Sequence, residues 1–542
     1  MTSSNSEIGL IQDAPVQDAP VQDAPVQDAP VQDAPVPDAA VSTRPKPLKN
    51  ALNLFRQFDE SQVRYCHFKS NEHLLDGLAG RTDLDVLIDR RHARAAHGAL
   101  ARCGFKRFAT KFGVAYPAIE DYMGFDDATG RLIHVQLHYS LVLGEKHLKG
   151  YQLRFDNEIL DTRVADDVTN VYISDPNYEM LLLLVRFALK VRFRDRVLEL
   201  LGRSYFRGRA LGEFRWLKGR TDPERLRILT ETEFGEKAGA MVDGLTVAPP
   251  SIRKLRKFRS SAADTLSRDR TCGPIEARPL RMAREFFWVL GGLNKRYFHL
   301  PIAFRLTNPT GGRIIAVLGP DGSGKSTITK KIHTWLTWTL DVYPVYLGSG
   351  DGKCSLIRWP MRLAFRVLGP FLRRHYPAPP RDDTGDGTGS RYRRVSPARA
   401  LWALVLALEK QSKMRAAVKA RNRGMIVVCD RFPQIQVRDF DGPMLVSWRE
   451  SSSLVLRRLG QWESKIYRQL VDIAPDLVIK LEVPPEVAVI RAPDMSLEES
   501  RWRMAAVRQI KYGRGSQTLV IDGTRPLDEV LLDVKKAIWE QL

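Results

Sequence analysis

Residues 313–330 read Arg-Ile-Ile-Ala-Val-Leu-Gly-Pro-Asp-Gly-Ser-Gly-Lys-Ser-Thr-Ile-Thr-Lys. The apolar run 314–318 predicts a buried parallel strand, because it is rich in β-branched residues and too short for a helix. A helical pattern begins after Lys325. Between the two lies the motif G-x-x-x-x-G-K-[ST]. Its fixed positions are Gly319, Gly324, Lys325 and Ser326.

The chemistry of phosphate binding requires this spacing. Glycines let the backbone N–H groups converge on a phosphate, and the following helix adds the positive end of its dipole. Lys325 can then reach the β- and γ-phosphates, and the Ser326 hydroxyl can hold Mg²⁺. The motif therefore predicts an ATP- and Mg²⁺-binding loop. Its residues are Gly319, Asp321, Gly322, Ser323, Gly324, Lys325, Ser326 and Thr327.

Length and charge limit the remaining possibilities. The 542 residues leave room for about three or four domains. The net charge is +21, although residues 1–43 alone carry seven acidic and no basic side chains. A basic body suits an anionic partner such as a nucleotide, a nucleic acid or a membrane surface, but it does not choose among them.

Cysteine usage and hydropathy indicate a reducing compartment. Five scattered cysteines without a C-x-x-C pair argue against a disulfide framework or a zinc site. The N-terminus lacks the basic and apolar regions of a signal peptide. The longest apolar runs, around 180–185 and 400–408, are too short to span a bilayer. We therefore expect a cytoplasmic protein.

A repeat occupies the N-terminus. Residues 12–36 repeat Gln-Asp-Ala-Pro-Val five times. A proline in every fifth position prevents helix and sheet, and one valine per repeat cannot build a core. Residues 1–46 are therefore expected to be a disordered tail, acting as a spacer or, less favoured, as a partner-binding segment.

Residues 47–175 are expected to form an α+β domain. A helical pattern is followed by a short strand at 63–68, and a second strand begins at Asp83-Leu-Asp85. Alternation along a strand puts Asp83 and Asp85 on one face, where they could share a divalent cation or could bond to the backbone or to Arg81.

The order of these elements resembles the nucleotidyltransferase fold over roughly residues 50–175. The resemblance rests on a strand, a turn containing Ser70, a helix and then Asp83-x-Asp85. It implies a second metal site at Asp83 and Asp85. The family prefers glycine where this chain has Lys69, and a third carboxylate where it has Gln136. The domain is therefore expected to be either an active transferase or, preferably, a degenerate accessory module.

Residues 176–307 are expected to be a basic, mainly helical connection. The segment 178–190 is apolar almost all round, which predicts a buried helix. Residues 251–259 hold five positive charges, and 281–299 mix cations with aromatic side chains. Residues 251–299 suggest weak contact with an anionic membrane or nucleic acid. Packed helices with solvated basic faces are the preferred alternative.

The C-terminal part, residues 308–542, continues the pattern of an α/β domain. We expect strands at 342–347 and 425–429, a Gly- and Pro-rich insertion at 376–397, and a helix at 397–422. The strand at 425–429 runs into Asp430-Arg431. A carboxylate there can reach the Mg²⁺ of a neighbouring phosphate loop, or can simply pair with the arginine.

These motifs resemble the thymidylate kinase family across residues 313–542. The carrying segments are the phosphate loop, Gly424-x-Ile-Val-Val-Cys-Asp-Arg-Phe432, Ala474–Ala488 and Leu519–Arg525. The resemblance implies a P-loop NTPase fold with a mostly parallel sheet, and a kinase. It implies that Asp430 and Ser326 hold Mg²⁺ and that Lys325 acts on the transferred phosphate. It also implies that Asp321, Arg415 and Arg431 face the acceptor, and that Arg491, Arg501 and Arg503 form a lid. The catalytic residues that it implies are Lys325, Asp430, Arg431, Arg491 and Arg501.

The acceptor stays open, because Gly348-Ser-Gly replaces the Arg-Glu-Pro-Gly-like acceptor segment of that family. We expect phosphoryl transfer to a phosphorylated small molecule, with a nucleoside monophosphate first. One alternative is nucleotidyl transfer by the N-terminal domain with a regulatory P-loop domain. The other is a non-enzymatic, nucleotide-gated protein that binds membrane or nucleic acid. A homodimer is compatible with each.

Overall fold

The computed structural model describes residues 45–348 and 397–542, apart from 112–114, 117, 146, 202–204, 439 and 514. Residues 45–542 form one compact unit. The expected tail at 1–46, except for its last two residues, and the expected insertion at 376–397, except for its final residue, lie outside the described residues.

The C-terminal sheet has five strands in the order β12-β13-β11-β14-β15, and every neighbouring pair is parallel. This sheet matches the parallel α/β arrangement expected from the buried apolar runs. Its strands are β11 (Ile314–Leu318), β12 (Val342–Tyr346), β13 (Ile426–Asp430), β14 (Leu477–Glu482) and β15 (Gln517–Asp522).

Helices cover both faces of this sheet because alternate side chains of β11 enter two different cores. Ile315 and Val317 pack with α13 and α19, whereas Ile314 and Ala316 pack with α15, α16 and α18. The helices are α13 (Lys325–Leu336), α15 (Pro397–Asn422), α16 (Leu454–Val471), α17 (Pro485–Arg491), α18 (Leu497–Gln509) and α19 (Leu527–Gln541). The helix expected at 397–422 is present with those bounds.

The connections of the sheet define where a ligand can bind. From β11 the chain builds β12 and β13 on one side and then crosses to β14 on the other. In such sheets the crevice lies at the carboxyl ends of the strands where the order reverses. The loop after β11 and the end of β13 meet at that point, since Val317 and Asp430 are register partners.

The N-terminal sheet has eight strands in the order β10-β3-β4-β5-β2-β1-β9-β8. Its central strands pack against α1, α2 and α3 through a core that includes Phe58, Val86 and Val135. The strands are β1 (Tyr65–His67), β2 (Leu84–Ile88), β3 (Lys106–Thr110), β4 (Ile119–Asp126), β5 (Arg131–His138), β8 (Val164–Ala165), β9 (Tyr172–Ile173) and β10 (Leu306–Thr307). The helices are α1 (Lys49–Glu60), α2 (Leu74–Leu78) and α3 (Ala93–Arg102).

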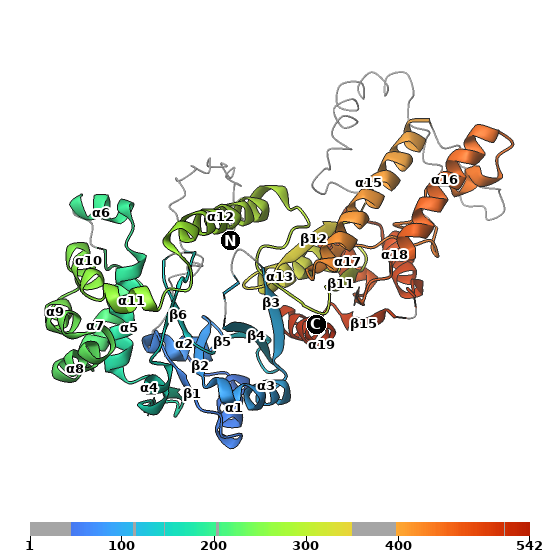
Figure 1. Ribbon diagram of the computed structural model, residues 1–542. Coiled ribbons are helices and arrows are strands. Elements are labelled where there is room, and N and C mark those ends of the chain that lie inside the picture. Colours follow the sequence, from blue (N-terminus) through green and yellow to red (C-terminus); the bar gives the residue numbers. More distant parts are fainter. Residues whose placement is uncertain are drawn as a thin grey trace, which may run out of the picture. The chain divides into compact units, whose positions relative to one another are not determined.

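The helices that follow share a core with this sheet. Helix α5 is buried along most of its length, as its apolar sequence predicted, and packs with Cys66, Phe68 and Leu87. Helices α7, α8 and α10 gather around α5 (Figure 1). A two-stranded sheet of β6 (Leu141–Leu143) and β7 (Tyr151–Leu153) joins the same core. The helices are α4 (Asp156–Asp161), α5 (Pro176–Lys190), α6 (Phe193–Leu200), α7 (Arg209–Lys218), α8 (Pro223–Phe234), α9 (Glu236–Thr246), α10 (Ile252–Ser261), α11 (Ala263–Arg268) and α12 (Pro274–Leu293).

The two sheets meet through apolar contacts. Phe125 of β4 stacks on Trp539 of α19 with ring centroids 5.8 Å apart. Phe108 and Met123 join the core that contains β11 and α13. Strand β10, which leads to the phosphate loop, pairs with β3 at the edge of the N-terminal sheet. Side chains of both sheets therefore belong to one hydrophobic core.

Within the described parts of the chain, no helix combines the length and the apolar character needed to cross a bilayer.

Candidate functional site

The loop between β11 and α13 has a backbone conformation that favours glycine at two positions. Gly322 and Gly324 have φ angles of 80° and 90°, in the left-handed region. A Cβ on Gly322 would also lie 2.3 Å from the carbonyl oxygen of Ala488. The strand before the loop and the helix after it are both present where the sequence predicted them.

Lys325 opens α13 and is almost fully buried beneath this loop. Its ammonium donates to the Pro320 carbonyl at 2.5 Å and lies 3.4 Å from Asp321 Oδ1. Burial, together with the nearby Arg431 guanidinium, lowers the pKa of Lys325 to about 8. Because a charged ammonium is costly in this position, an incoming anion would stabilise it.

Ser326 and Asp430 face each other at the ends of α13 and β13. The Ser326 hydroxyl donates to Asp430 Oδ2 over 3.3 Å. The other carboxylate oxygen, Oδ1, is buried and has no hydrogen-bond partner among the described residues. Burial raises the pKa of Asp430. A buried acceptor without a partner, next to a hydroxyl, fits a hard cation such as Mg²⁺.

Asp321 is the centre of a cluster of arginines beside the loop. Arg431 Nη2 donates to Asp321 Oδ1 at 2.5 Å, and Arg503 pairs with the other oxygen. Arg431 also bonds to Asp441 Oδ2 at 3.2 Å and has a φ of 67°, an uncommon conformation for a residue other than glycine. Burial penalises the charge of Asp321, but Arg431 and Lys325 outweigh it and lower the pKa of Asp321.

A cavity of about 320 Å³ opens beside the loop. Arg491 of α17 lines it and donates to the Gly523 carbonyl at 3.2 Å. The segment after β15, expected to form the base side of a nucleotide site, supplies Gly523 and Arg525. The phosphate loop and the start of α13 supply Ser323, Gly324 and Thr327. The loop and this segment, nearly 200 residues apart in sequence, therefore line one cavity.

Two other predicted arginines lie elsewhere. Arg501 of α18 is exposed, is 3.6 Å from Glu486, and lines a groove with Asp522 and Thr524. Arg415 is exposed on α15. Arg503, two residues after Arg501, forms an ion pair with Asp321 in the loop. The acceptor role of Arg415 and the catalytic role of Arg501 stay predictions.

The second predicted metal site, at Asp83 and Asp85, has a different environment. Asp85 Oδ1 lies 2.9 Å from the Lys69 ammonium and accepts a hydrogen bond from His138 Nε2 at 3.0 Å. Burial alone would raise the pKa of Asp85, but Lys69 and His138 hold it well below its usual range. Asp83 accepts a hydrogen bond from Thr82 at 3.1 Å.

A polar face of β5 continues this environment. His134, Gln136 and His138 alternate along the strand, while Ile133, Val135 and Leu137 enter the core on the other side. His138 bonds to Asp85 on β2. His134 Nε2 and Gln136 Nε2 both contact Asp121 Oδ1 on β4, at 2.9 Å and 3.2 Å.

The carboxylate next to Gln136 is Asp121, on the neighbouring strand β4. Asp85 and Asp121 are the register partners of Gln136 on its two sides. Their Cα atoms are therefore separated by two strand spacings, roughly 10 Å. Nowhere in residues 45–348 and 397–542, as described, do three His, Cys, Asp or Glu side chains gather in a way that could hold a metal.

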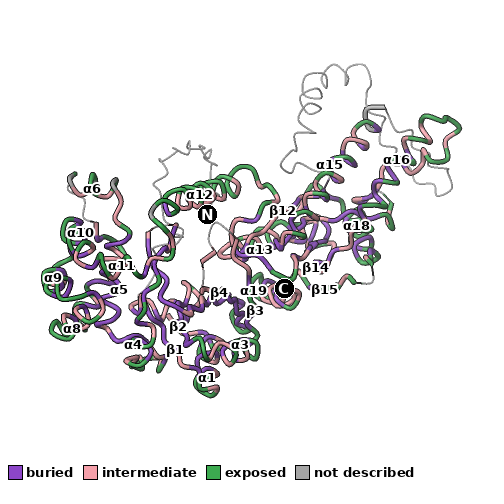
Figure 2. Tube along the Cα trace, viewed as in Figure 1, coloured by how far each residue is buried: buried purple, intermediate pink, exposed green. Residues whose placement is uncertain are grey.

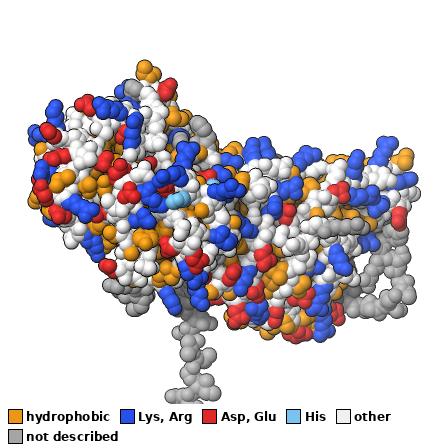
Figure 3. All heavy atoms as spheres, turned by 60° about the horizontal axis from the view of Figure 1, so that its bottom comes forward, with side chains coloured by type: hydrophobic (Ala, Val, Ile, Leu, Met, Phe, Trp, Pro, Cys, Tyr) orange, Lys and Arg blue, Asp and Glu red, His pale blue; other side chains and the backbone are white. Residues whose placement is uncertain are grey.

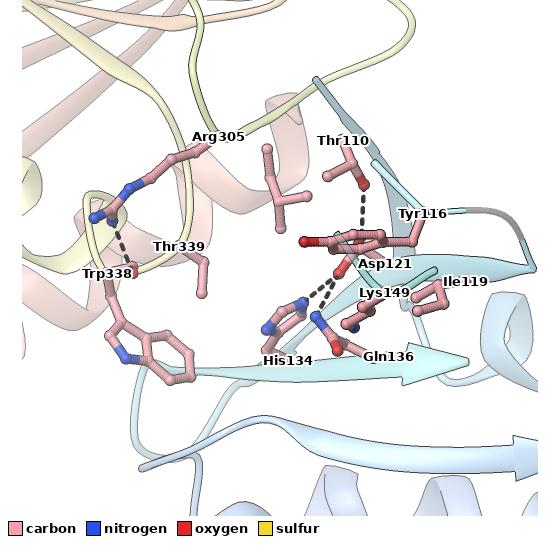
Figure 4. A pocket seen from close by; sticks show the side chains of 11 residues that line it. Thr110, Tyr116, Ile119, Asp121, His134, Gln136, Lys149, Arg305, Trp338 and Thr339 are labelled. Atoms are coloured by element: carbon pink, nitrogen blue, oxygen red, sulfur yellow. Dashed lines mark hydrogen bonds and ion pairs between the residues drawn. The ribbon is translucent and has the colours of Figure 1, made fainter. Parts of the chain in front are cut away.

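Sequence reasoning did not find Asp121, His134 and Lys149. The alternation of His134 with Gln136 was a visible signal, but the register between β4 and β5 was not. Lys149 lies in the stretch after β6 and lines a cavity with Asp121 and His134 (Figure 4).

The sequence was also compared with known proteins. No protein-family model matches it. It is 29% identical over 244 residues to the uncharacterized ATP-binding protein YghS of Escherichia coli K12, covering 97% of that protein and 44% of this chain. It is 31% identical over 233 residues to the uncharacterized ATP-binding protein YghR of the same strain, covering 86% of that protein and 42% of this chain. The chain belongs to the family of YghR.

Proposed function

We propose that residues 308–542 bind ATP and Mg²⁺ and transfer a phosphoryl group to a phosphorylated small molecule, with a nucleoside monophosphate as the first candidate. One observation carries the proposal. A buried lysine and the Ser326–Asp430 pair converge on a glycine loop that borders a cavity of about 320 Å³. Two relatives whose names describe them as ATP-binding proteins support the ATP part.

The donor side uses the loop. Its N–H groups and the Lys325 ammonium would hold the β- and γ-phosphates. Ser326 and Asp430 would hold Mg²⁺, which when bound neutralises charge on the phosphate oxygens. Arg491 and Arg525 line the adjoining cavity, where they could bind the rest of the nucleotide.

The acceptor side uses the arginine cluster. Asp321 holds Arg431 and Arg503 beside the loop by ion pairs. An acceptor phosphate could compete with Asp321 for these guanidinium groups, which suit bidentate binding of oxyanions. Phosphoryl transfer requires alignment and charge neutralisation more than covalent chemistry from the protein, and this cluster is suited to supply both.

The proposal is tested by incubating the full chain with γ-labelled ATP, Mg²⁺ and a panel of nucleoside monophosphates and sugar phosphates. We expect one acceptor to gain the label. Lys325→Ala should abolish transfer, whereas Lys330→Ala, an exposed lysine of the same helix, should not. Equal transfer by wild type and Lys325→Ala would overturn the proposal.

A second candidate function, attachment to an anionic lipid surface, is favoured by helix α12. Ten of the 28 large apolar side chains exposed among the described residues fall within 275–302. They recur at helical spacing, with Ile275, Met282 and Phe286 between 65% and 87% exposed. Figure 2 shows much of α12 as exposed. An apolar stripe of this length on a surface helix is typical of interfacial helices.

The charges around α12 fit lipid better than a second copy of the chain. Arg281 and Arg284 face inward and bond to Glu145 and to the Ala115 carbonyl. Arg278, Lys295 and Arg296 are exposed beside the apolar stripe. Two copies packed through this face would bring like charges together, whereas anionic headgroups would neutralise them.

Elsewhere the basic charge is dispersed. Helix α10 buries Ile252, Leu255 and Phe258 and turns its cations to solvent, which is the packed-helix interpretation preferred for residues 251–259. In Figure 3, Lys and Arg side chains are scattered over the visible face rather than gathered in one patch. The lipid proposal therefore rests on α12 alone.

Sedimentation with phosphatidylcholine vesicles, with and without phosphatidylglycerol, tests this second function. We expect binding to the anionic vesicles, and Phe286→Glu should abolish it. Ile228→Glu, a substitution of a 50%-exposed side chain on α8, should not. No sedimentation, a dimer that Phe286→Glu dissociates, or retention on DNA without retention on vesicles would each overturn it.

A further inference from the structure

A second cavity, of about 210 Å³, lies between the N-terminal sheet and the segment after α13 (Figure 4). Asp121, His134 and Gln136 line it from β4 and β5. Trp338 and Thr339, which follow helix α13, line the opposite wall together with Arg305. The volume is below the roughly 300–1,000 Å³ of pockets for drug-sized ligands, so the occupant must be small.

The divalent cation implied by the nucleotidyltransferase resemblance does not fit the adjoining residues. The Lys69 ammonium already lies 2.9 Å from Asp85, about the place where a cation would neutralise that carboxylate. His138 occupies the same oxygen, and Gln136 replaces the third carboxylate. A lysine has therefore taken over the charge-neutralising role of a metal ion.

The cavity itself has spare positive charge. Both oxygens of Asp121 are satisfied, Oδ2 by Thr110 at 2.6 Å and Oδ1 by His134 and Gln136. The pKa of His134 is raised because Asp121 outweighs the effect of burial. Among the described residues His134 is the ion-pair partner of Asp121, and neither Lys149 nor Arg305 forms an ion pair with it.

Lys149 is a cation of this cavity that is not part of an ion pair among the described residues. Its ammonium lies 4.5 Å from the centre of the Tyr116 ring, and no described carboxylate forms an ion pair with it. Burial, followed by repulsion from Lys69, lowers the pKa of Lys149 to about 8. Arg305 adds a guanidinium on the other wall, where it donates to the Thr337 carbonyl at 3.2 Å.

We propose that this cavity binds a small oxyanion, as free phosphate or as the phosphate group of a compact metabolite, through Lys149 and without a divalent cation. An oxyanion there would accept hydrogen bonds from Lys149 and Gln136 and would pair with a charge that is otherwise partly buried and unmatched. The Trp338 and Tyr116 rings give the cavity apolar walls for the rest of such a molecule. This site is independent of phosphoryl transfer at the P-loop.

Orthophosphate is the first probe, with ³¹P line broadening of the full chain as the readout. Lys149→Met keeps the length of the side chain and removes its charge, so we expect phosphate affinity to fall about 10-fold or more. Lys218→Met, at an exposed lysine of α7, should leave it unchanged. Glycerol phosphate, titrated in parallel, separates a phosphate ester from the free ion as the preferred occupant.

Two further arms separate this site from the phosphate loop and from a metal site. Lys325→Ala should retain the Lys149-dependent binding, whatever it does to ATP. Replacing Mg²⁺ with EDTA should leave the affinity within about twofold. Equal affinity of wild type and Lys149→Met, or a requirement for Mg²⁺, would overturn the proposal.

A site-resolved measurement guards against misfolding of the variant. Reductive methylation of the wild-type protein, read lysine by lysine by mass spectrometry, should show Lys149 protected by orthophosphate and Lys218 not protected. Labelling of Lys149 that phosphate does not slow would overturn the proposal.

Discussion

The phosphate loop and the polar face of β5 both bring carboxylates close to lysines, but they use them differently. At the loop, Lys325 bonds mainly to a backbone carbonyl, and one oxygen of Asp430 has no partner among the described residues. On the N-terminal sheet, the Lys69 ammonium is already in contact with Asp85. The loop therefore has room for a cation and an anionic ligand. On the N-terminal sheet, the Asp85 carboxylate is already paired with Lys69.

The position of a carboxylate on a strand therefore does not by itself define a metal site. Asp430 and Asp85 both lie on strands of a sheet beside a turn. What separates them is the neighbouring side chain, which is the Ser326 hydroxyl at the start of α13 in one case and the Lys69 ammonium, just after β1, in the other. The hydroxyl can join a cation's ligands, but the ammonium competes with the cation.

The largest expected effect is on phosphoryl transfer at the phosphate loop. Lys325→Ala removes a buried ammonium from the phosphate site, so we expect at least about a 100-fold loss of phosphoryl transfer. The circular dichroism spectrum should not change. Steady-state kinetics checks this, with Lys330→Ala as the matched control. A loss below about threefold would contradict the assigned role.

The stability of the Lys69–Asp85 pair on the N-terminal sheet can also be tested. Asp85→Asn leaves Lys69 buried without its counter-ion, so the free energy of unfolding should fall by about 3 kcal/mol. Adding Lys69→Met to that variant should restore part of the loss, because it removes the unpaired charge. Urea unfolding provides the measurement, and nucleotide affinity should stay within about twofold in both variants. A loss of nucleotide affinity without a loss of stability would contradict the structural role assigned to Asp85.

An intermediate effect concerns the cation site of the loop. Asp430→Asn keeps the shape of the side chain but weakens a Mg²⁺ ligand, so the Mg²⁺ concentration for half-maximal activity should rise about tenfold. Burial raises the pKa of Asp430, so the neutral amide should not destabilise the fold. Activity as a function of Mg²⁺ concentration is the readout. Asp472→Asn, at the end of α16, serves as the control.

A pH dependence distinguishes the two lysine sites. Lys149 has a pKa lowered to about 8, and it faces Lys69, Asp83, Asp85 and Asp121. Its positive charge is present below that pH and is lost as the pH rises through it. Binding of sulfate, whose own charge is constant, should therefore fall several-fold between pH 7 and pH 9. Lys149→Met should abolish this dependence, and a flat profile in the wild type would count against Lys149 as the ligand.

Another prediction compares two arginines of α18. Arg503 pairs with Asp321 beside the loop, whereas Arg501 is exposed next to Glu486. We expect Arg503→Ala to lower turnover by about tenfold and Arg501→Ala to stay within about twofold. The opposite order in steady-state kinetics would contradict the role assigned to Arg503.

Part of the fold and of the phosphate loop could be predicted from the sequence, because these features depend on local residue patterns. The parallel strands, the glycine loop and the helix at 397–422 follow from apolar runs, glycine spacing and helical period. The choice between Arg501 and Arg503 could not be predicted, because residues two apart on a helix point in nearly opposite directions. The partnership of Asp121 with Gln136 depends on strand register, and no local pattern fixes that.

The role of Lys69 also could not be predicted from a local pattern. In the sequence it is only a departure from the glycine that the nucleotidyltransferase resemblance implies. In the fold its ammonium lies 2.9 Å from Asp85, 16 positions further on, where the resemblance implies a cation. A departure from a motif can therefore be an active part of the site.

The most direct test of the central claim is isothermal titration calorimetry of the folded chain with ATP in the presence of Mg²⁺. We predict saturable binding at one site per chain, weakened at least tenfold by Asp430→Asn and abolished by Lys325→Ala. No heat of binding in folded wild-type protein, or binding that both substitutions leave unchanged, would contradict the account.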